Sequence, residues 1–359
     1  MATSQIADAL DRQLGPFIEQ MLALLRIPGM AVGVVAEGAT VYARGFGVAS
    51  LADRRPVTAE TLFHMASVTK PFVATAIMQL AEERLVGLDD PVVRHLPYFR
   101  MADERSAQIT IRQMLSHTSG MPDEDDYGWE RPEFDEGALE RYVRSLADRP
   151  LLGAPGERFA YSNIAYEVLG DLIAKVRGIS FEAAIAERIL RPLRMTQSTL
   201  LVRDADPSLL SRGHVVDAGG EARVSAVFPY HRAHAPSSTL YSNVTEMCRW
   251  AMALLNGGEL SGARVLSRES LERMWEPGLV VDPERHERIG LSWFIDAYRG
   301  RRTINHGGSD TGFRSQLFLV PEAGLAAVAM SNVDYVFEAQ WSATMAALEI
   351  ALGPSGDRS

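Results

Sequence analysis

Apolar positions repeat along the chain with two different periods, and the order of the two predicts the architecture. A helical period of three to four residues recurs at residues 4–25, 137–147, 163–177, 181–190, 244–255, 267–275 and 336–352. Short apolar, β-branched runs typical of strands lie at residues 30–36, 40–48, 290–298, 303–305, 314–320 and 325–331. Strand patterns therefore occupy both ends of the chain, and helical patterns occupy its middle.

This order favours an α+β protein with one antiparallel sheet built from both ends of the chain. The terminal helices would flank the sheet, and an all-helical domain would be inserted between its strands. We place the sheet domain at residues 1–66 and 236–359 and the mainly helical domain at 67–235. Residues from about 200 to 236 follow neither period and are expected to be irregular.

Composition narrows the range of partners. The 359 residues carry a formal net charge of −10 and no basic face, which argues against binding to nucleic acid or to an anionic membrane. A single cysteine, Cys248, excludes an internal disulfide. Acidic residues interrupt the first apolar segment, and no run is long enough to span a membrane. We therefore expect a cytoplasmic protein without a signal peptide, and the oligomeric state stays open.

The first candidate for chemistry is Ser67-Val68-Thr69-Lys70. In a helix that begins near Ser67, the hydroxyl and the amine would lie on one face, one turn apart. A serine hydroxyl is a weak nucleophile until a neighbouring base or cation activates it. Buried lysine can act as that base, whereas arginine keeps its proton. The chain has 36 Lys+Arg, of which only Lys70 and Lys175 are lysines, so a lysine here stands out.

Two motifs later in the chain are further candidates for chemistry beside Ser67 and Lys70. They are Tyr161-Ser162-Asn163 and His306-Gly307-Gly308-Ser309. In this order, Ser-x-x-Lys, Tyr-x-Asn and Lys/His-x-Gly resemble the serine β-lactamase and penicillin-binding protein superfamily. The resemblance covers roughly residues 25–332. It is closest to the branch that holds class C β-lactamases, family VIII carboxylesterases, D-aminopeptidases and D,D-peptidases. The resemblance implies a β-lactamase/D,D-peptidase-like fold, with the active site between the sheet domain and the helical domain.

The resemblance implies a role for each motif residue. Ser67 would be the acylated nucleophile, and Lys70 and Tyr161 would share proton transfer. Tyr161 would act as a phenolate or as a hydrogen-bond relay, and then as the general acid to the leaving group. A phenolate would require the field of Lys70 to lower the pKa of Tyr161. The expected substrate-binding and oxyanion residues are Asn163, His306, Gly307, Gly308 and Ser309, with the backbone N–H groups of Ser67 and Ser309 as oxyanion donors. No metal and no cofactor are implied.

His306 departs from the lysine that is usual at this position in β-lactamases and D,D-peptidases. Histidine is mostly neutral at pH 7, so it would not attract a substrate carboxylate as lysine does. His-x-Gly is familiar in the esterase and D-aminopeptidase relatives. Residues 123–136 form an acidic loop with eight carboxylates, which would repel anionic β-lactams if the loop overhangs the cleft. Esterase activity on small acyl esters is therefore the favoured hypothesis.

Other functions stay open. The same nucleophile could serve a β-lactamase, a D-aminopeptidase or D,D-peptidase, or an acyltransferase, and the chain could also be a catalytically silent binding or scaffold protein. The sequence contains no Gly-x-Ser-x-Gly elbow of α/β-hydrolases. His214, His231 and His234 could suggest zinc, but no HExxH-like helix accompanies them. The expected partner is a small-molecule ester or amide substrate.

Overall fold

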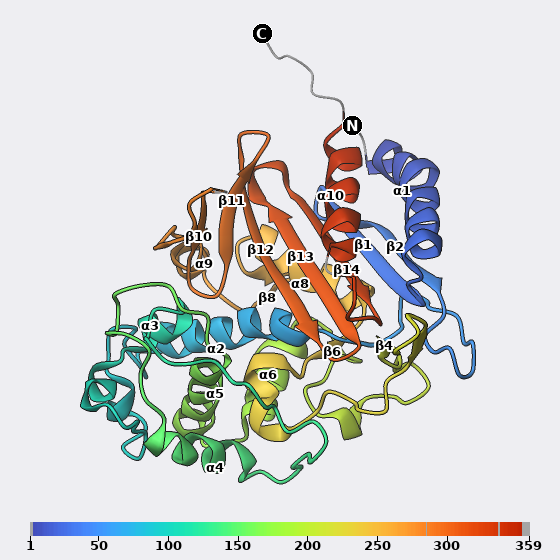
Figure 1. The fold of residues 1–359 in the computed structure, drawn as a ribbon. Helices are drawn as coiled ribbons and strands as arrows, with labels where there is room; N and C mark the ends of the chain where they lie inside the picture. The colour runs from blue at the N-terminus through green and yellow to red at the C-terminus, as the bar shows by residue number, and fades with distance from the viewer. Residues whose placement is uncertain (1–2, 285, 337, 354–359) are drawn as a thin grey trace.

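The central element is a large antiparallel sheet (Figure 1). The computed structural model describes residues 3–284, 286–336 and 338–353. Within them the sheet has eight strands in the order β2-β1-β14-β13-β12-β11-β10-β9. Their bounds are β1 Gly29–Ala36, β2 Ala39–Gly47, β9 Val280–Asp282, β10 Glu287–Ile289, β11 Phe294–Tyr298, β12 Arg301–Asp310, β13 Phe313–Val320 and β14 Leu325–Ser331. The sheet therefore draws its strands from both ends of the chain.

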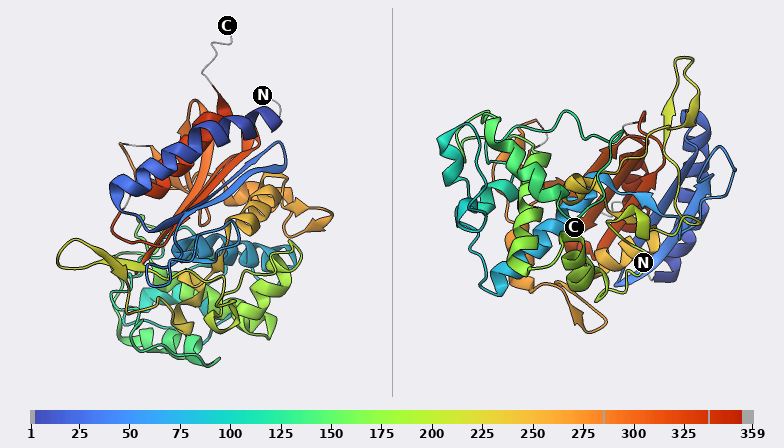
Figure 2. Two further views of the ribbon diagram at one scale, coloured as in Figure 1. Left: turned by 90° about the vertical axis from the view of Figure 1, so that its right-hand side faces the viewer. Right: turned by 90° about the horizontal axis from the view of Figure 1, so that it is seen from below.

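Helices flank the sheet and fill the middle of the chain. They are α1 Thr3–Leu25, α2 Lys70–Glu82, α3 Ile111–Leu115, α4 Ala138–Ser145, α5 Asn163–Arg177, α6 Phe181–Ile185, α7 Ala235–Ser238, α8 Val244–Leu255, α9 Arg268–Met274 and α10 Ala339–Leu352. Figure 2 shows α1 and α10 together on one face of the sheet. The helices from α2 to α7 lie below the sheet in the view of Figure 1. The expected α+β fold is confirmed, while the exact domain boundaries stay a prediction.

Burial on both faces explains why the central strands are apolar throughout. Every residue of β1, β13 and β14 is buried, with α1 and α10 packed on one side and α8 on the other. A strand covered on both faces has no solvent-exposed alternate positions, so it appears in the sequence as a continuous apolar run. The continuous apolar runs from which these strands were predicted therefore reflect the burial of the strands on both faces.

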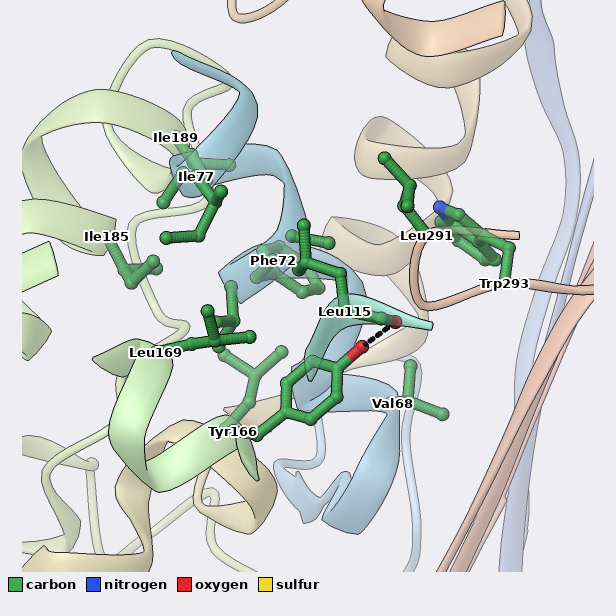
Figure 3. Close-up of a cluster of buried hydrophobic side chains, with 14 of the residues drawn as sticks. Val68, Phe72, Ile77, Leu115, Tyr166, Leu169, Ile185, Ile189, Leu291 and Trp293 are labelled. Carbon is green, nitrogen blue, oxygen red and sulfur yellow. Dashed lines mark hydrogen bonds between the residues drawn. The ribbon is translucent and has the colours of Figure 1, made fainter. Parts of the chain in front are cut away.

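The helical part shares one core with a face of the sheet, and the start of α2 lies within it. Figure 3 shows Val68 and Phe72 packed with side chains from α5 and from the segment before β11. Tyr166 of α5 donates its hydroxyl to the backbone carbonyl of Leu115, which ties α5 to the end of α3 (2.8 Å). The side chains of Val68 and Phe72 are fully buried. This packing fixes the backbone at Val68, and with it the direction in which the neighbouring side chains point.

The structure also corrects several sequence expectations. The predicted helix at 181–190 is α6 followed by a π-helical turn at Ala186–Leu190. The supposedly irregular stretch near 200–236 contains a hairpin of β4 (His214–Val216) and β5 (Ala222–Val224). Two further short pairs are β3 (Phe63–His64) with β6 (Tyr241–Ser242) and β7 (Glu259–Leu260) with β8 (Ala263–Arg264). Among the described helices, none is long and apolar enough to cross a lipid bilayer.

Candidate active site

The nucleophile candidate lies just before the largely buried helix α2. Ser67 is in a short 3₁₀ turn at Ala66–Thr69, which leads directly into α2. Ala66 has a φ of 47°, a left-handed conformation that alanine rarely adopts. Such local strain persists only where the surrounding structure enforces it, and it often marks a functional site. Pro71 is tolerated because it lies in the first turn of α2, where no backbone bond needs its missing N–H.

Lys70 is completely buried and is held by three acceptors. Its Nζ donates to Ser67 Oγ at 2.8 Å, to Asn163 Oδ1, and to the backbone carbonyl of Ser237 at 2.9 Å. Three acceptors satisfy all the donors of an ammonium group, so the amine is fixed in position. The predicted contact between Lys70 and Ser67 is therefore present, as is the expected contact with Asn163.

Tyr161 completes the group around Ser67. Its hydroxyl hydrogen-bonds to the Ser67 side chain, and Lys70 Nζ lies 5.1 Å from the centre of its ring. His117 stacks on the Tyr161 ring with centroids 4.2 Å apart, and its Nδ1 accepts the backbone N–H of Ser162 at 3.1 Å. His117 therefore positions Tyr161 and the turn that follows it.

The third motif brings an open strand edge to the nucleophile. The ladder between β11 and β12 ends at Asn305, whereas the ladder between β12 and β13 continues to Asp310. Residues 306–310 are thus paired along one edge only within the described sheet. A Cβ built on Gly308 would lie 2.3 Å from the backbone carbonyl oxygen of Met65. Glycine at this position therefore lets β12 approach the turn that carries Ser67.

These elements enclose one cleft of about 440 Å³. It is lined by Ser67, Tyr161, Asn163, Glu287, Phe294, Asn305, His306, Gly307, Gly308, Ser309, Arg314, Ser315, Gln316, Gln340 and Trp341. Every predicted site residue except the buried Lys70 is in this lining, and Lys70 contacts two of its members. The cleft therefore lies where the sheet meets the helical part of the chain.

Burial sets the proton affinities at this site and corrects one expectation. It lowers the pKa of Lys70 to about 7, against the opposing charges of three carboxylates, the strongest being Glu167. Burial raises the pKa of Tyr161, and the hydrogen bond with Ser67 offsets only part of that rise. The expectation that Lys70 would make Tyr161 a phenolate is therefore wrong. Tyr161 therefore remains a neutral hydroxyl, which is compatible with a role as a hydrogen-bond relay.

His306 is neutral and buried. Burial, followed by the charge of Lys70, lowers its pKa to about 3. Its Nδ1 lies 2.7 Å from the carbonyl oxygen of Gly307, whereas its Nε2 has no partner among the described residues. His306 thus brings no positive charge to the cleft.

Sequence reasoning missed two contacts that complete the site. Asp123 accepts hydrogen bonds from the backbone N–H and the side-chain amide of Asn163, at 2.8 and 2.9 Å. These bonds orient the amide so that its oxygen faces Lys70. The carbonyl of Ser237 is the other missed acceptor. A backbone carbonyl leaves no residue signature, but the run of carboxylates that begins at Asp123 could have indicated the first contact.

The acidic loop lies beside the site, and part of its charge is offset by arginines. None of its residues, all of which the structure describes, lines the cleft. Trp129 donates its indole N–H to Asp310, at the end of β12, at 3.0 Å. Five of the eight carboxylates form ion pairs with arginines, namely Glu124, Asp126, Glu133, Asp135 and Glu136. The expected repulsion of anionic substrates is therefore weaker than eight formal charges imply.

Three further histidines make structural contacts. His64 Nε2 lies 3.1 Å from Asp310 Oδ2, which ties β3 to the end of β12. His214 accepts the N–H of Leu51, and His231 accepts the N–H of Ala233. Within the described ranges, no group of three His, Cys, Asp or Glu residues is arranged to hold a metal ion.

The fold and the site together define a class. An antiparallel sheet and a helical region that meet at a Ser-x-x-Lys turn, a tyrosine and a glycine-rich strand edge are the features of a penicillin-binding or β-lactamase-type serine hydrolase. Comparison with known families agrees. The chain belongs to the β-lactamase family, whose model, described as Beta-lactamase, matches residues 16–351. The resemblance found in the three motifs is thereby confirmed.

The individual relatives of known name have low sequence identity to this chain. The chain is 29% identical over 353 residues to the Unguisins hydrolase ungD' of Aspergillus campestris, covering 93% of this chain and 64% of that protein. It is 25% identical over 324 residues to Protein flp of Staphylococcus aureus, covering 90% and 63%. The chain thus spans less than two thirds of the length of these relatives. The structure of an octameric penicillin-binding protein homologue from Pyrococcus abyssi superposes with a TM-score of 0.83, at 27% identity, over 95% of this chain and 77% of that one.

Proposed function

We propose that this chain is a serine hydrolase that forms an acyl-enzyme on Ser67, with small neutral acyl esters as substrates. The observation that carries the proposal is the contact of Lys70 Nζ with Ser67 Oγ, made by a lysine whose pKa burial lowers to about 7. A lysine in this range is partly neutral at physiological pH and can accept the serine proton, which an ordinary lysine cannot.

The reaction would follow from the positions of these groups. Neutral Lys70 takes the Ser67 proton as Oγ attacks the substrate carbonyl, whose oxygen accepts bonds from the N–H groups of Ser67 and Ser309. Tyr161 donates its proton to the leaving alcohol and regains one from Lys70. Water then attacks the ester carbonyl of the acyl-enzyme, with Lys70 again the base, and Ser67 leaves as the alcohol.

One observation supports an ester over a carboxylate-bearing β-lactam, and another supports hydrolysis over acyl transfer. His306 stands where a lysine would attract a carboxylate, and it is neutral. A neutral short ester needs no such cation. The name of the Aspergillus relative, a hydrolase, favours water as the acyl acceptor over acyl transfer to another molecule. A binding or scaffold function would not require the complete set of Ser67, Lys70 and Tyr161.

Arg314 favours a second candidate, which is amide hydrolysis of β-lactams. It lines the cleft, and its guanidinium donates two hydrogen bonds to the backbone carbonyl of Asp334. A guanidinium at the cleft has the charge that attracts a substrate carboxylate. The two candidates therefore differ in the charge of the substrate that the cleft selects.

A paired assay distinguishes them. The native protein and Ser67→Ala are tested with p-nitrophenyl acetate and with a chromogenic cephalosporin, and Ser208→Ala, an exposed serine outside the cleft, is the matched control. We expect ester turnover in the native protein and the control, its loss in Ser67→Ala, and little cephalosporin hydrolysis. Strong cephalosporin turnover would favour the second candidate. Ester turnover that survives in Ser67→Ala would exclude the mechanism.

A further inference from the structure

Behind Lys70 lies a second layer of buried polar groups that the proposed reaction does not use. Glu167 and Ser237 are fully buried and His234 is 3% exposed, and none of the three lines the catalytic cleft. Glu167 Oε1 accepts the Ser237 hydroxyl at 2.6 Å and lies 3.1 Å from His234 Nδ1. Its other oxygen, Oε2, has no hydrogen-bond partner in the part of the chain that the structure describes. A buried carboxylate with one unpaired oxygen is costly to the fold, so its presence needs an explanation.

The helix that carries Glu167 also carries part of the catalytic site. Glu167 follows Asn163 by four residues in α5, so the two side chains project from the same face, one turn apart. Asn163 accepts a hydrogen bond from Lys70. α5 also packs against α2 and α7, the helices that contain Lys70 and Ser237. Glu167 therefore lies in the layer directly behind the Lys70 amine.

Ser237 connects the two groups through both of its oxygens. Its backbone carbonyl accepts the Lys70 ammonium at 2.9 Å, and its hydroxyl donates to Glu167. The position of that carbonyl therefore depends on a side chain that Glu167 holds. The carboxylate also acts directly, because among the charges that oppose the burial-driven fall in the pKa of Lys70, Glu167 is the largest. Glu167 therefore acts on the Lys70 amine in two ways, through the position of the Ser237 carbonyl and through its negative charge.

We propose that Glu167 is a positioning residue for Lys70, which holds the Ser237 carbonyl in place and whose negative charge sets the pH range in which Lys70 accepts the Ser67 proton. The inference rests on the function proposed above, because it needs Lys70 to act as the base. It adds a residue outside the three family motifs and outside the cleft. Glu167 itself touches neither substrate nor Ser67.

Other charged and titratable groups act on the same pair. Those facing Lys70 are Asp123, Asp310, Tyr161, Tyr166, His117 and His306. Those facing Glu167 are Lys70, His234, Tyr127 and Tyr142. Burial raises the pKa of Glu167, and the hydrogen bond with His234 is the first contact that opposes this rise. His234 therefore helps to keep the carboxylate charged beside Lys70.

The test replaces Glu167 with glutamine, which keeps the shape and the acceptor oxygen but removes the charge. Without the negative charge, Lys70 loses its proton more easily. The acid limb of the kcat/KM profile for p-nitrophenyl acetate should therefore move by about one unit to lower pH, with the plateau at high pH kept within threefold. Asp171→Asn is the matched control, since Asp171 is a buried carboxylate one turn further along α5 that bonds to Tyr98 instead. In this control the limb should stay in place.

Glu167→Asp separates charge from geometry. It retains the charge but draws the carboxylate back by one methylene, so the limb should stay at the native pH while the plateau falls through the weakened hold on Ser237. This variant tests the proposal even if Glu167→Gln does not fold. A limb that moves in the aspartate variant, or stays in place in a folded glutamine variant, would overturn the proposal. A purely structural role would lower the plateau in both variants without moving either limb.

The rate of Ser67 labelling by a fluorophosphonate, followed by intact mass, gives a second readout. It depends on activation of Ser67 but not on ester hydrolysis. If the native protein is labelled with an acid limb near pH 7 but turns over no ester, the proposed function fails while the role of Glu167 is still tested by the shift of that limb. If the labelling rate of the native protein shows no acid limb, Lys70 is not the base and the inference fails with it.

Discussion

Replacing Gly308 with alanine tests whether the close approach of β12 to the nucleophile turn is what makes the site. A Cβ at this position would lie 2.3 Å from the carbonyl oxygen of Met65 and 2.4 Å from Ser315 Oγ. The Ser315 hydroxyl already donates to the same carbonyl at 2.6 Å. Because one of the two obstacles is backbone, no rotamer change can remove the clash. The strand must move away from the turn that carries Ser67.

The size of that movement follows from the contact. Carbon and oxygen atoms need a separation of somewhat over 3 Å, so β12 must retreat by about 1 Å. A displacement of this size can reduce a rate by about 100-fold, and the loss of one oxyanion donor costs about 100- to 1,000-fold. We therefore expect kcat/KM for p-nitrophenyl acetate to fall by at least about 100-fold. Overpacking should also lower the free energy of unfolding by about 1–3 kcal/mol.

The neighbouring glycine provides the matched control. A Cβ on Gly307 would meet Gln316 Oε1 at 2.8 Å, and this atom ends a side chain that can turn aside. Gly307→Ala should therefore lose less than about tenfold in kcat/KM. Kinetics and thermal unfolding of both variants measure the difference. If Gly308→Ala keeps its activity within fivefold of the native protein while folded, or if the two variants lose activity equally, the reasoning from the contact is refuted.

Three further predictions concern charge. The acid limb of kcat/KM in the native protein should lie near pH 7, where burial places the pKa of Lys70, and a limb above pH 9 would contradict this value. His306→Lys should lower KM for a carboxylate-bearing cephalosporin about tenfold and leave KM for the neutral ester unchanged, since lysine adds a fixed cation. Equal effects on both substrates would count against this role of the charge at position 306. From pH 7 to 10, the native protein should gain about 1.4 kcal/mol of unfolding free energy per pH unit relative to Lys70→Met. The sign follows because the unfolded chain still binds the lysine proton in this window while the folded protein does not; parallel pH dependences of the two proteins would exclude a depressed pKa.

Elements with clear end signals were predictable from the sequence. The pattern at 163–177 coincides with α5, Asn163–Arg177, whose start is capped by Ser162 and whose end is the left-handed Gly178. The strand predicted at 303–305 was too short, because His306-Gly307-Gly308 has little strand propensity of its own. β12 reaches Asp310 because its ladder with β13 holds it there. Tertiary pairing therefore decided the one strand boundary on which the site depends.

Some residues of the candidate site could likewise be predicted from the sequence, and others could not. Its motif residues could be found because the chemistry requires particular side chains, and the structure brings them to one cleft. The Ser237 carbonyl could not be found, because any residue supplies a backbone carbonyl. Nor could Glu167, whose importance depends on its being directly behind Lys70 and fully buried. The proton affinity of Tyr161 was misjudged for a related reason, since its pKa depends on the depth of burial, which no local pattern reveals.

In the proposed reaction, these proton affinities favour Lys70 as the group that carries the proton of Ser67. Among the described residues in contact with Ser67, the pKa of Lys70 is about 7, whereas burial raises that of Tyr161. His306, which lines the same cleft, stays neutral because its pKa is about 3. In the proposed reaction, the proton taken from Ser67 would therefore reside on Lys70, and Tyr161 would pass a proton to the leaving group only as fast as Lys70 replaces it. Because arginine could not give up a proton at neutral pH, the chain needs a lysine at this position although it uses arginine for nearly every other cation.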